Sequence, residues 1–356
     1  MRTLKGPSIF LAQFVQDRHP YNSLTGLAQW AADKGFVAVQ MPTNLPQIFD
    51  LALAAESQMY CDDVMDKLAI HGIAISELST HLQGQCMAIH PAYASLLTAF
   101  MPAHVHESPQ QQVVWASEQL CMAARASSRL HLQACATFSG SLAWPYLYPW
   151  PQRPAGLIDT AFRELAHRWQ PVLDVYDKYG IDLCFELHPG EDLFDGLSFD
   201  RFLKEVDQHP RCHILYDPSH FVLQQLDYLE FIDIYHERIR MFHVKDAEYR
   251  PNGRAGVYGG YADWVDRPGR FRSVGDGQVD FKAIFSKLCQ YNYQGWVVLE
   301  WECCLKHSEV GARQGAEFIR KHIITTSHRH FDDFAASKIK SSQVRTMLGL
   351  SDLDEL

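Results

Sequence analysis

The chain has 356 residues, of which 47% are hydrophobic, and a formal net charge of −10 at pH 7. This length and apolar content allow either a single α/β barrel with extensions or two domains. The excess of acidic residues argues against a general nucleic-acid binder or a protein of anionic membranes, because both need a basic face.

The nine cysteines include no Cys-x-x-Cys pair, so the sequence indicates neither a zinc ribbon nor a disulfide framework. The first apolar run, residues 8–14, is too short for a signal peptide or a membrane span. We therefore predict a reduced, cytoplasmic protein without a membrane or nucleic-acid partner.

The first half of the chain alternates apolar runs with helical patterns. The predicted strands are residues 8–14, 36–41, 73–78 and 130–137, and the predicted helices are 24–34, 57–71 and two pieces between 91 and 128. Glycines 35 and 72 end the first two helices, and prolines 102 and 109 interrupt the third helical region. The loop at 139–154 carries Trp144, Tyr146, Tyr148 and Trp150.

The second half continues the alternation. Strands are predicted to start at residues 181, 212, 239 and 295, with helices at 158–179, 199–207, 228–237, 281–291 and 309–324. Eight alternations are typical of a (β/α)8 TIM barrel. We expect this barrel over residues 1–325 and a polar, partly helical C-terminal extension over 326–356.

Four successive apolar strands finish on an ionisable side chain. These residues are Glu186, Asp217, His243 and Glu300. An unpaired buried ion costs several kcal/mol, so four such groups at one barrel end point to a shared cation. One histidine with three carboxylates suits Mn²⁺, our first expectation, and also Mg²⁺, Co²⁺ or Zn²⁺.

Other polar residues near these strand ends are candidates for substrate binding. His220 either contacts a ligand or caps the following helix, and His188 either extends beyond Glu186 or stabilises its loop. Lys245 could hydrogen-bond a substrate oxygen, or it could simply pair with Asp246. Weaker candidates are Gln13, Gln40, Thr80, His81 and Gln83.

Two loops add further expectations. The rings of Trp144 and Tyr146 could contact the C–H face of a sugar, or they could pack in a subunit interface of a homo-oligomer. Residues 247–279 contain seven glycines, and a loop of this length is typically functional. This segment is therefore either a cover for the site or a mobile surface loop.

The motifs Glu-Leu-His-Pro-Gly at 186–190, Asp-Pro-Ser-His at 217–220, His-Val-Lys-Asp at 243–246 and Leu-Glu-Trp-Glu at 299–302 carry a family resemblance. With Ser-Thr-His-Leu at 79–82, they make residues 8–325 similar to the xylose isomerase-like TIM barrels, the sugar phosphate isomerase/epimerase superfamily. The resemblance implies a divalent metal held by Glu186, Asp217, His243 and Glu300. It also implies that Glu186 and Glu300 exchange the substrate proton, that His220 contacts substrate oxygens and that Lys245 lies in the substrate pocket.

From these residues we predict a metal-dependent sugar isomerase or epimerase that transfers a proton next to a carbonyl, acting on a ketose, an inosose or a keto-glycoside. The same site would serve a keto-sugar or inosose dehydratase or another lyase. A metal-dependent sugar binder without turnover is the alternative outside enzymology. A multi-zinc phosphodiesterase is disfavoured because the sequence offers too few histidine ligands.

Overall fold

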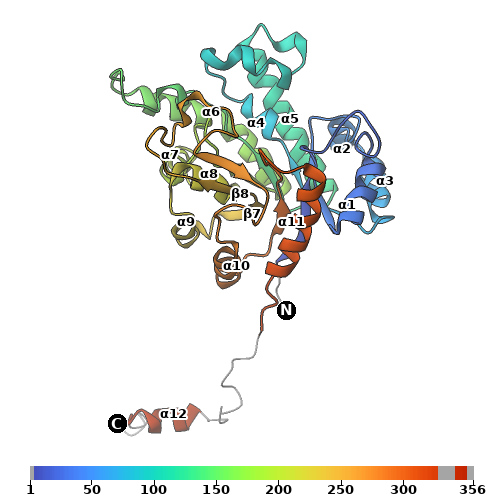
Figure 1. Cartoon of the computed structure of the whole chain (residues 1–356), viewed down its shortest axis with the longest axis vertical. Helices are drawn as coiled ribbons and strands as arrows, with labels where there is room; N and C mark the ends of the chain where they lie inside the picture. Colours follow the sequence, from blue (N-terminus) through green and yellow to red (C-terminus); the bar gives the residue numbers. More distant parts are fainter. Residues whose placement is uncertain (1–3, 328–340, 351–356) are drawn as a thin grey trace. The chain divides into compact units, whose positions relative to one another are not determined.

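The computed structural model describes residues 4–327 and 341–350. The chain divides into two compact units, one formed by residues 3–324 and the other by residues 1–2 and 325–356. The larger unit is a closed barrel of eight parallel strands with helices around it (Figure 1), which confirms the predicted (β/α)8 fold. The predicted domain boundary after residue 325 stays a prediction.

The barrel strands follow one another in chain order. They are β1 (Lys5–Phe10), β2 (Ala38–Pro42), β3 (Ala74–Ser79), β4 (Ala134–Thr137), β5 (Asp182–Glu186), β6 (Cys212–Tyr216), β7 (Ile239–Val244) and β10 (Trp296–Leu299). Strand β10 closes the barrel between β7 and β1. Since all eight strands run in parallel, their carboxyl ends meet at one face of the barrel, where this fold places its active sites.

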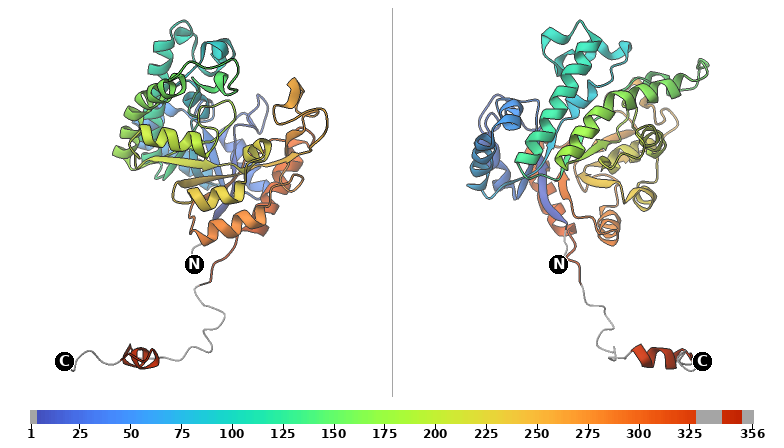
Figure 2. Two further views of the ribbon diagram at one scale, coloured as in Figure 1. Left: turned by 90° about the vertical axis from the view of Figure 1, so that its left-hand side faces the viewer. Right: turned by 180° about the vertical axis from the view of Figure 1, so that it is seen from behind.

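Helices pack around the outside of the strands, and α5 and α6 lie side by side (Figure 2). The helices of the larger unit are α1 (Leu24–Lys34), α2 (Leu51–Glu56), α3 (Gln58–Ala69), α4 (His81–Gln85), α5 (Pro109–Arg129), α6 (Leu157–Tyr179), α7 (Gly196–Glu205), α8 (Pro218–Gln224), α9 (Tyr228–Tyr235), α10 (Phe281–Gln290) and α11 (Ser308–His322). Helix α1 has the predicted bounds. The Ser23 hydroxyl accepts the Gly26 N–H at its start, and Gly35 ends it with a φ of 94°.

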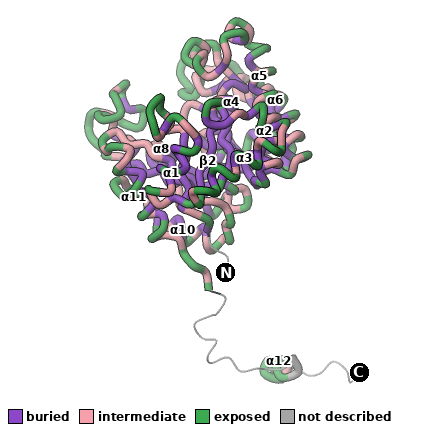
Figure 3. The backbone as a smooth tube through the Cα atoms, turned by 90° about the vertical axis from the view of Figure 1, so that its right-hand side faces the viewer, coloured by how far each residue is buried: buried purple, intermediate pink, exposed green. Residues whose placement is uncertain are grey.

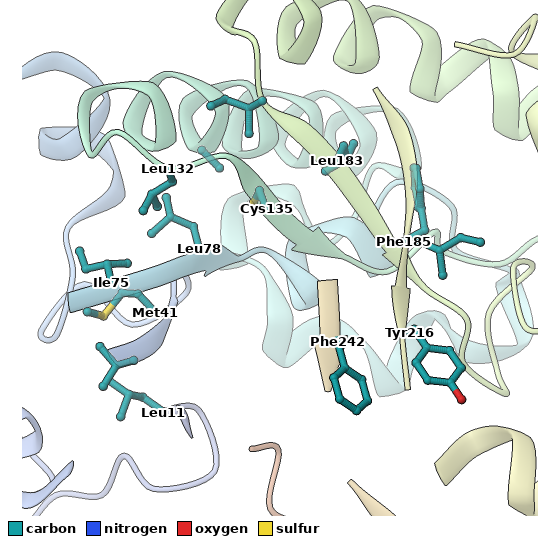
Figure 4. Close-up of a cluster of buried hydrophobic side chains, with 14 of the residues drawn as sticks. Leu11, Met41, Ile75, Leu78, Leu132, Cys135, Leu183, Phe185, Tyr216 and Phe242 are labelled. Atoms are coloured by element: carbon teal, nitrogen blue, oxygen red, sulfur yellow. The ribbon is translucent and has the colours of Figure 1, made fainter. Parts of the chain in front are cut away.

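The core has two main parts, and a third, small cluster consists of Val222, Ala247 and Phe271. The larger part lies between the strands and the helices, and Figure 4 shows Leu78, Cys135 and Phe185 from it on neighbouring strands. The smaller part fills one side of the barrel interior with Ala134, Ala136, Cys184, Leu215 and Met241. Burial on both faces explains why the strand sequences show no polar alternation (Figure 3).

The structure corrects two predicted elements in the first half of the chain. Strand β1 is Lys5–Phe10 and not residues 8–14, because the chain turns after it and the Phe14 N–H donates to the Leu11 carbonyl. The region before Pro109 forms short 3₁₀ helices and no α-helix. These are η1 (Pro91–Leu96), η2 (Thr98–Phe100) and η3 (Ala103–Val105), and Pro102 separates the second from the third.

The glycine-rich segment 247–279 is not an irregular loop throughout. Strands β8 (Asp246–Tyr249) and β9 (Gly269–Arg272) form an antiparallel ribbon across its two ends. The sequence patterns do not predict the short helices α2, α4 and α8. In the smaller unit, α12 (Ser341–Met347) is helical, as predicted for the extension, and residues 328–340 and 351–356 of that prediction lie outside the described residues.

Candidate active site

Four neighbouring strands bring the predicted ionisable residues together. Glu186 ends β5, Asp217 follows β6, His243 lies near the end of β7 and Glu300 follows β10. We call these four residues the strand-end cluster. Their potential ligand atoms all lie within 4.8 Å of one another, and all four side chains are buried. The barrel order β10, β7, β6, β5 makes these strands consecutive, which explains how residues 114 positions apart in sequence converge.

The chemistry of the cluster fits a divalent cation. Three carboxylates and one imidazole supply oxygen and nitrogen donors, which is a ligand set for Mn²⁺, Mg²⁺, Co²⁺ or Zn²⁺. Among the described residues, Asp217 Oδ2 is buried and makes no hydrogen bond of good geometry, and its nearest donors are His220 Nε2 at 3.3 Å and Lys245 Nζ at 3.6 Å. A cation at the cluster would satisfy this oxygen. The cluster could therefore hold a divalent metal.

Lys245 lies fully buried beside the cluster. Its Nζ atom is 3.3 Å from Glu300 Oε2, 3.6 Å from Asp217 Oδ2 and 2.9 Å from Glu302 Oε2. Burial lowers the lysine pKa, but the surrounding carboxylates, Glu300 first, outweigh it and raise the pKa well above its usual value. Lys245 is therefore protonated at neutral pH among these acids.

The alternative prediction that Asp246 pairs with Lys245 is wrong. The Asp246 carboxylate instead accepts the backbone N–H groups of Ala247, Gly275, Gly277 and Val279 at 2.9 to 3.2 Å. It thereby ties the two ends of the segment 247–279 together. Phe271 of this segment lies under the Lys245 ammonium at 4.5 Å from the ring centre, so the segment does contact the site.

Two histidines engage Glu186. His81 Nε2 lies 2.8 Å from Glu186 Oε2, and His220 Nε2 lies 3.1 Å from Glu186 Oε1. Burial would raise the pKa of Glu186, but the contacts with His220 and His81 hold it well below its usual range. His220 lies inside α8, whose N-terminal cap is Asp217, so the prediction that His220 caps this helix is wrong.

His188 lies next to His220, with ring centres 4.1 Å apart. Desolvation and the neighbouring charge of His220 lower the His188 pKa to about 3. A neutral ring at this position can accept or donate a hydrogen bond. Its Nδ1 is 2.6 Å from the Pro189 carbonyl oxygen, which fits the alternative of a loop-stabilising contact.

Besides His81, two of the weaker candidates contact the cluster and two do not. Gln13 Nε2 donates to Glu300 Oε1 at 3.0 Å, and Gln40 Oε1 lies 3.0 Å from His243 Nε2. Thr80 instead donates to the backbone of β4, and Gln83 donates to the Thr43 hydroxyl. Gln13 and Gln40 therefore belong to the site, whereas Thr80 and Gln83 make contacts that stabilise the fold.

A cavity of about 460 Å³ lies beside the cluster, and Glu300 is the cluster residue that lines it. Its walls include Phe10, Gln13, His81, Phe138, Glu300 and Glu302. This volume lies within the range of small-molecule sites, and two aromatic rings with several polar groups suit a compact polyhydroxy compound.

The structure does not bring Trp144 and Tyr146 to this cavity. Trp144 lines a separate cavity with Phe194, and Tyr146 contacts His90 at 5.4 Å between ring centres. The backbone N–H of Trp144 donates to Asp192 Oδ1 at 2.9 Å. This hydrogen bond fixes the loop on the side of the barrel where Asp192 lies. The role of both rings in substrate binding stays a prediction.

Sequence reasoning missed Glu302, Phe10, Phe138 and Phe271. Glu302 could have been found, because it lies two residues after Glu300 and alternate residues of an extended segment face the same side. The three phenylalanines looked like ordinary core residues.

Within the described residues, no helix has the length and apolar character needed to cross a bilayer. Cytoplasmic location and homo-oligomer formation stay predictions.

Comparison with known proteins places the chain among barrels of this type. Residues 28–322 match the family model described as the xylose isomerase-like TIM barrel. An inosose dehydratase from Bacillus velezensis is 33% identical over 126 residues, which is 35% of this chain and 42% of the relative. A second one, from Geobacillus kaustophilus, is 25% identical over 205 residues, covering 53% and 63%.

The alignments with these curated relatives span about half of the relatives' length. Among solved structures, the 3-keto-D-glucoside 4-epimerase from E. coli superposes with a TM-score of 0.57 at 15% identity, covering 86% of this chain and 97% of that chain. At this identity the superposition shows a common fold.

Proposed function

Because the chain belongs to the xylose isomerase-like TIM barrel family, we propose that it is a divalent-metal-dependent enzyme that removes a proton next to the carbonyl of a polyhydroxy ketone. We further propose dehydration of an inosose-type ring as the outcome, with Mn²⁺ as the metal. Residues of the strand-end cluster and the buried Lys245 support this proposal.

The observation that carries it is the presence of two glutamates in one buried cluster. Glu186 and Glu300 come from β5 and from the end of β10, which are separated in the barrel by β6 and β7. Two carboxylates that reach a shared centre from different strands can approach the same substrate carbon from different directions. A site for binding alone does not need both groups.

A divalent cation held by the cluster would polarise the ketone and make the adjacent C–H more acidic. The chain's own residues supply the other functions. Glu300, which lines the cavity, accepts the proton from the carbon, and the rings of Phe10 and Phe138 orient the ring of the substrate. Gln13 holds Glu300 in place through its 3.0 Å hydrogen bond.

Lys245 is the residue that favours dehydration over epimerisation in this proposal. Elimination needs a proton donor in addition to the base. The C–O bond of the β-hydroxyl breaks, and the departing oxygen must be protonated to leave as water. Lys245 is a buried cation 3.3 Å from Glu300, so it can donate this proton close to the group that removes the first one. The inosose dehydratases among the relatives favour the same outcome.

Epimerisation or isomerisation is the second candidate. The pair of Glu186 and Glu300 favours it, since one carboxylate could remove the proton and the other could return it on the opposite face. A sugar binder without turnover would show metal-dependent affinity but would exchange no proton.

The test is incubation of the purified protein and Mn²⁺ in D₂O with a panel of inososes, ketoses and 3-keto-glycosides. A product lighter by one water, with metal-dependent formation, is expected from an inosose. Deuterium uptake without loss of water would establish the epimerase alternative. Neither change, with metal binding confirmed, would overturn the proposed proton transfer.

A further inference from the structure

Strand β3 contains one extra residue where it passes Gln40 of β2. Val39 pairs with Ile75 and Met41 pairs with Leu78, so the single residue Gln40 lies opposite both Ser76 and Glu77. This two-against-one pairing is a β-bulge. Bulges turn a side chain away from the regular alternation and are frequent next to active sites.

The bulge places Glu77 inside the barrel. Its neighbours Ile75 and Leu78 belong to the outer core, whereas the Ser76 hydroxyl contacts the Ser8 hydroxyl of β1, the strand on the other side of β2, at 2.9 Å. Glu77 is only 3% exposed. The opposite side of the interior is apolar, so the bulge gives the barrel one polar side that contains a carboxylate.

Gln40 connects this polar side to the strand-end cluster. His243 Nδ1 faces Glu300 at 2.9 Å, and His243 Nε2 lies 3.0 Å from Gln40 Oε1. A ring that donates from Nε2 to the amide oxygen keeps the Nδ1 lone pair free for a cation. The orientation of the Gln40 amide therefore decides which tautomer His243 adopts.

The NH₂ group of the Gln40 amide faces Glu77. Within the described part of the chain, Gln40 Nε2 and Glu77 Oε2 are a buried donor and a buried acceptor without a partner of good hydrogen-bond geometry. The two side chains nevertheless interact: burial raises the Glu77 pKa to about 7, while Ser76, His243 and the Gln40 amide act in the opposite direction.

We propose that Glu77 is a positioning residue of the metal site, which acts through Gln40. By accepting from the Gln40 Nε2 group, it directs the amide oxygen towards His243 and so holds the His243 Nδ1 lone pair towards the cluster. This inference rests on the proposed function, since it requires that the cluster binds a metal.

The test is a double-mutant cycle read by Mn²⁺ affinity in isothermal titration calorimetry. Residues that orient a metal-bound histidine contribute about 10- to 100-fold to affinity, so Glu77→Leu should weaken Mn²⁺ binding by about tenfold or more. Glu77→Gln retains an acceptor oxygen and should keep most of the affinity. In a Gln40→Leu background, Glu77→Leu should cause no further loss.

The control is Cys184→Ala, which alters the barrel interior at a similar depth on the apolar side. It should lower stability and leave the Mn²⁺ affinity unchanged. Equal losses in Glu77→Leu and Glu77→Gln, unchanged affinity in both, or additive losses in the double variant would each overturn the inference while leaving the proposed function intact. Absence of Mn²⁺ binding by the native chain would overturn both.

Discussion

The Nζ atom of Lys245 lies 2.9 Å from a carboxylate oxygen of Glu302, and Glu302 lines the cavity. This contact connects the buried ammonium to the cavity. Glu302 is the most exposed acid that contacts this lysine, with 40% of its side chain accessible. A proton that Lys245 donates can therefore be restored from the cavity side. This arrangement suits a group that protonates a leaving hydroxyl once per turnover.

Replacing Lys245 by methionine should separate the two halves of the proposed reaction. Removal of the general acid should slow loss of water by about 10²- to 10⁴-fold, while deuterium uptake next to the carbonyl persists. Product mass and proton exchange in D₂O measure the two steps. Lys306→Met, which removes a cation that pairs with Asp276 outside the cluster, is the matched control. Equal loss of both steps would contradict the assignment of Lys245 to protonation alone.

Replacing Glu300 by glutamine should abolish proton exchange. The side chain keeps its shape and can still meet Gln13, but it loses the charge needed to accept a proton. We expect a decrease of about 10² or more in the exchange rate measured by NMR. Glu317→Gln changes an exposed acid on α11 and should have no effect. Unchanged exchange in Glu300→Gln would remove this residue from the mechanism.

The sequence was informative where chemistry coincides with a strand end. Glu186 and Glu300 each interrupt an apolar run, and such interruptions are costly unless a function or a partner offsets them, so both could be located from sequence. Glu77 gave no comparable signal. Its inward position depends on the bulge opposite Gln40, and bulges have no clear signature in a single sequence.

The partners of Asp246 and the position of Trp144 were unpredictable for a different reason. Both depend on how long loops fold back on the barrel. Asp246 meets Gly275 and Gly277 only because the ribbon brings the two ends of its segment together. Charge and aromatic content indicated a contact in each case, but neither property specifies the partner.

Replacing Asp246 by asparagine should loosen the segment 247–279. An asparagine directs one NH₂ group at backbone donors, so at least two of the four hydrogen bonds are lost. Hydrogen bonds to charged groups contribute about 1.5 to 3 kcal/mol each, and we expect the free energy of unfolding to fall by about 3 kcal/mol. Urea unfolding measures this loss, and trypsin should cleave after Arg254 faster.

The control for Asp246 is Asp263→Asn, an exposed acid in the same segment. It should match the native chain in both measurements. Unchanged proteolysis in Asp246→Asn would show that the ribbon strands, rather than the carboxylate, hold the segment.

Addition of Mn²⁺ should stabilise the native chain and not the Asp217→Asn variant. Asparagine can still cap α8, because its side-chain oxygen accepts the Ser219 N–H as Asp217 Oδ1 does at 2.8 Å. It lacks the second anionic oxygen that faces the cluster. At a metal concentration 100 times the dissociation constant, binding adds about 2.7 kcal/mol. Thermal melts with Mn²⁺ and with EDTA test this, and an equal shift in both proteins would place the metal elsewhere.

Glu191 makes stability depend on pH. Its Oε2 atom accepts the Gly140 N–H at 2.6 Å, and burial, the largest cause, together with the nearby charge of Asp192 raises its pKa to about 8. Between its usual pKa of 4.5 and this value, the folded state retains a proton that the unfolded chain releases. The stability from this proton is complete below pH 4.5 and is lost as the pH rises through 8, at up to about 1.4 kcal/mol per pH unit.

Glu191→Gln mimics the protonated side chain, so it should remove this dependence. Relative to the native chain, the variant should gain stability as the pH is raised from 6 to 9, as measured by urea midpoints across this range. The matched control is Glu118→Gln, an exposed acid on α5, which should keep the native slope. A variant that runs parallel to the native chain at every pH would mean that Glu191 is already ionised in the fold. Burial would then be offset by its hydrogen bonds to Gly140 and Ser139, which hold the loop that carries Trp144.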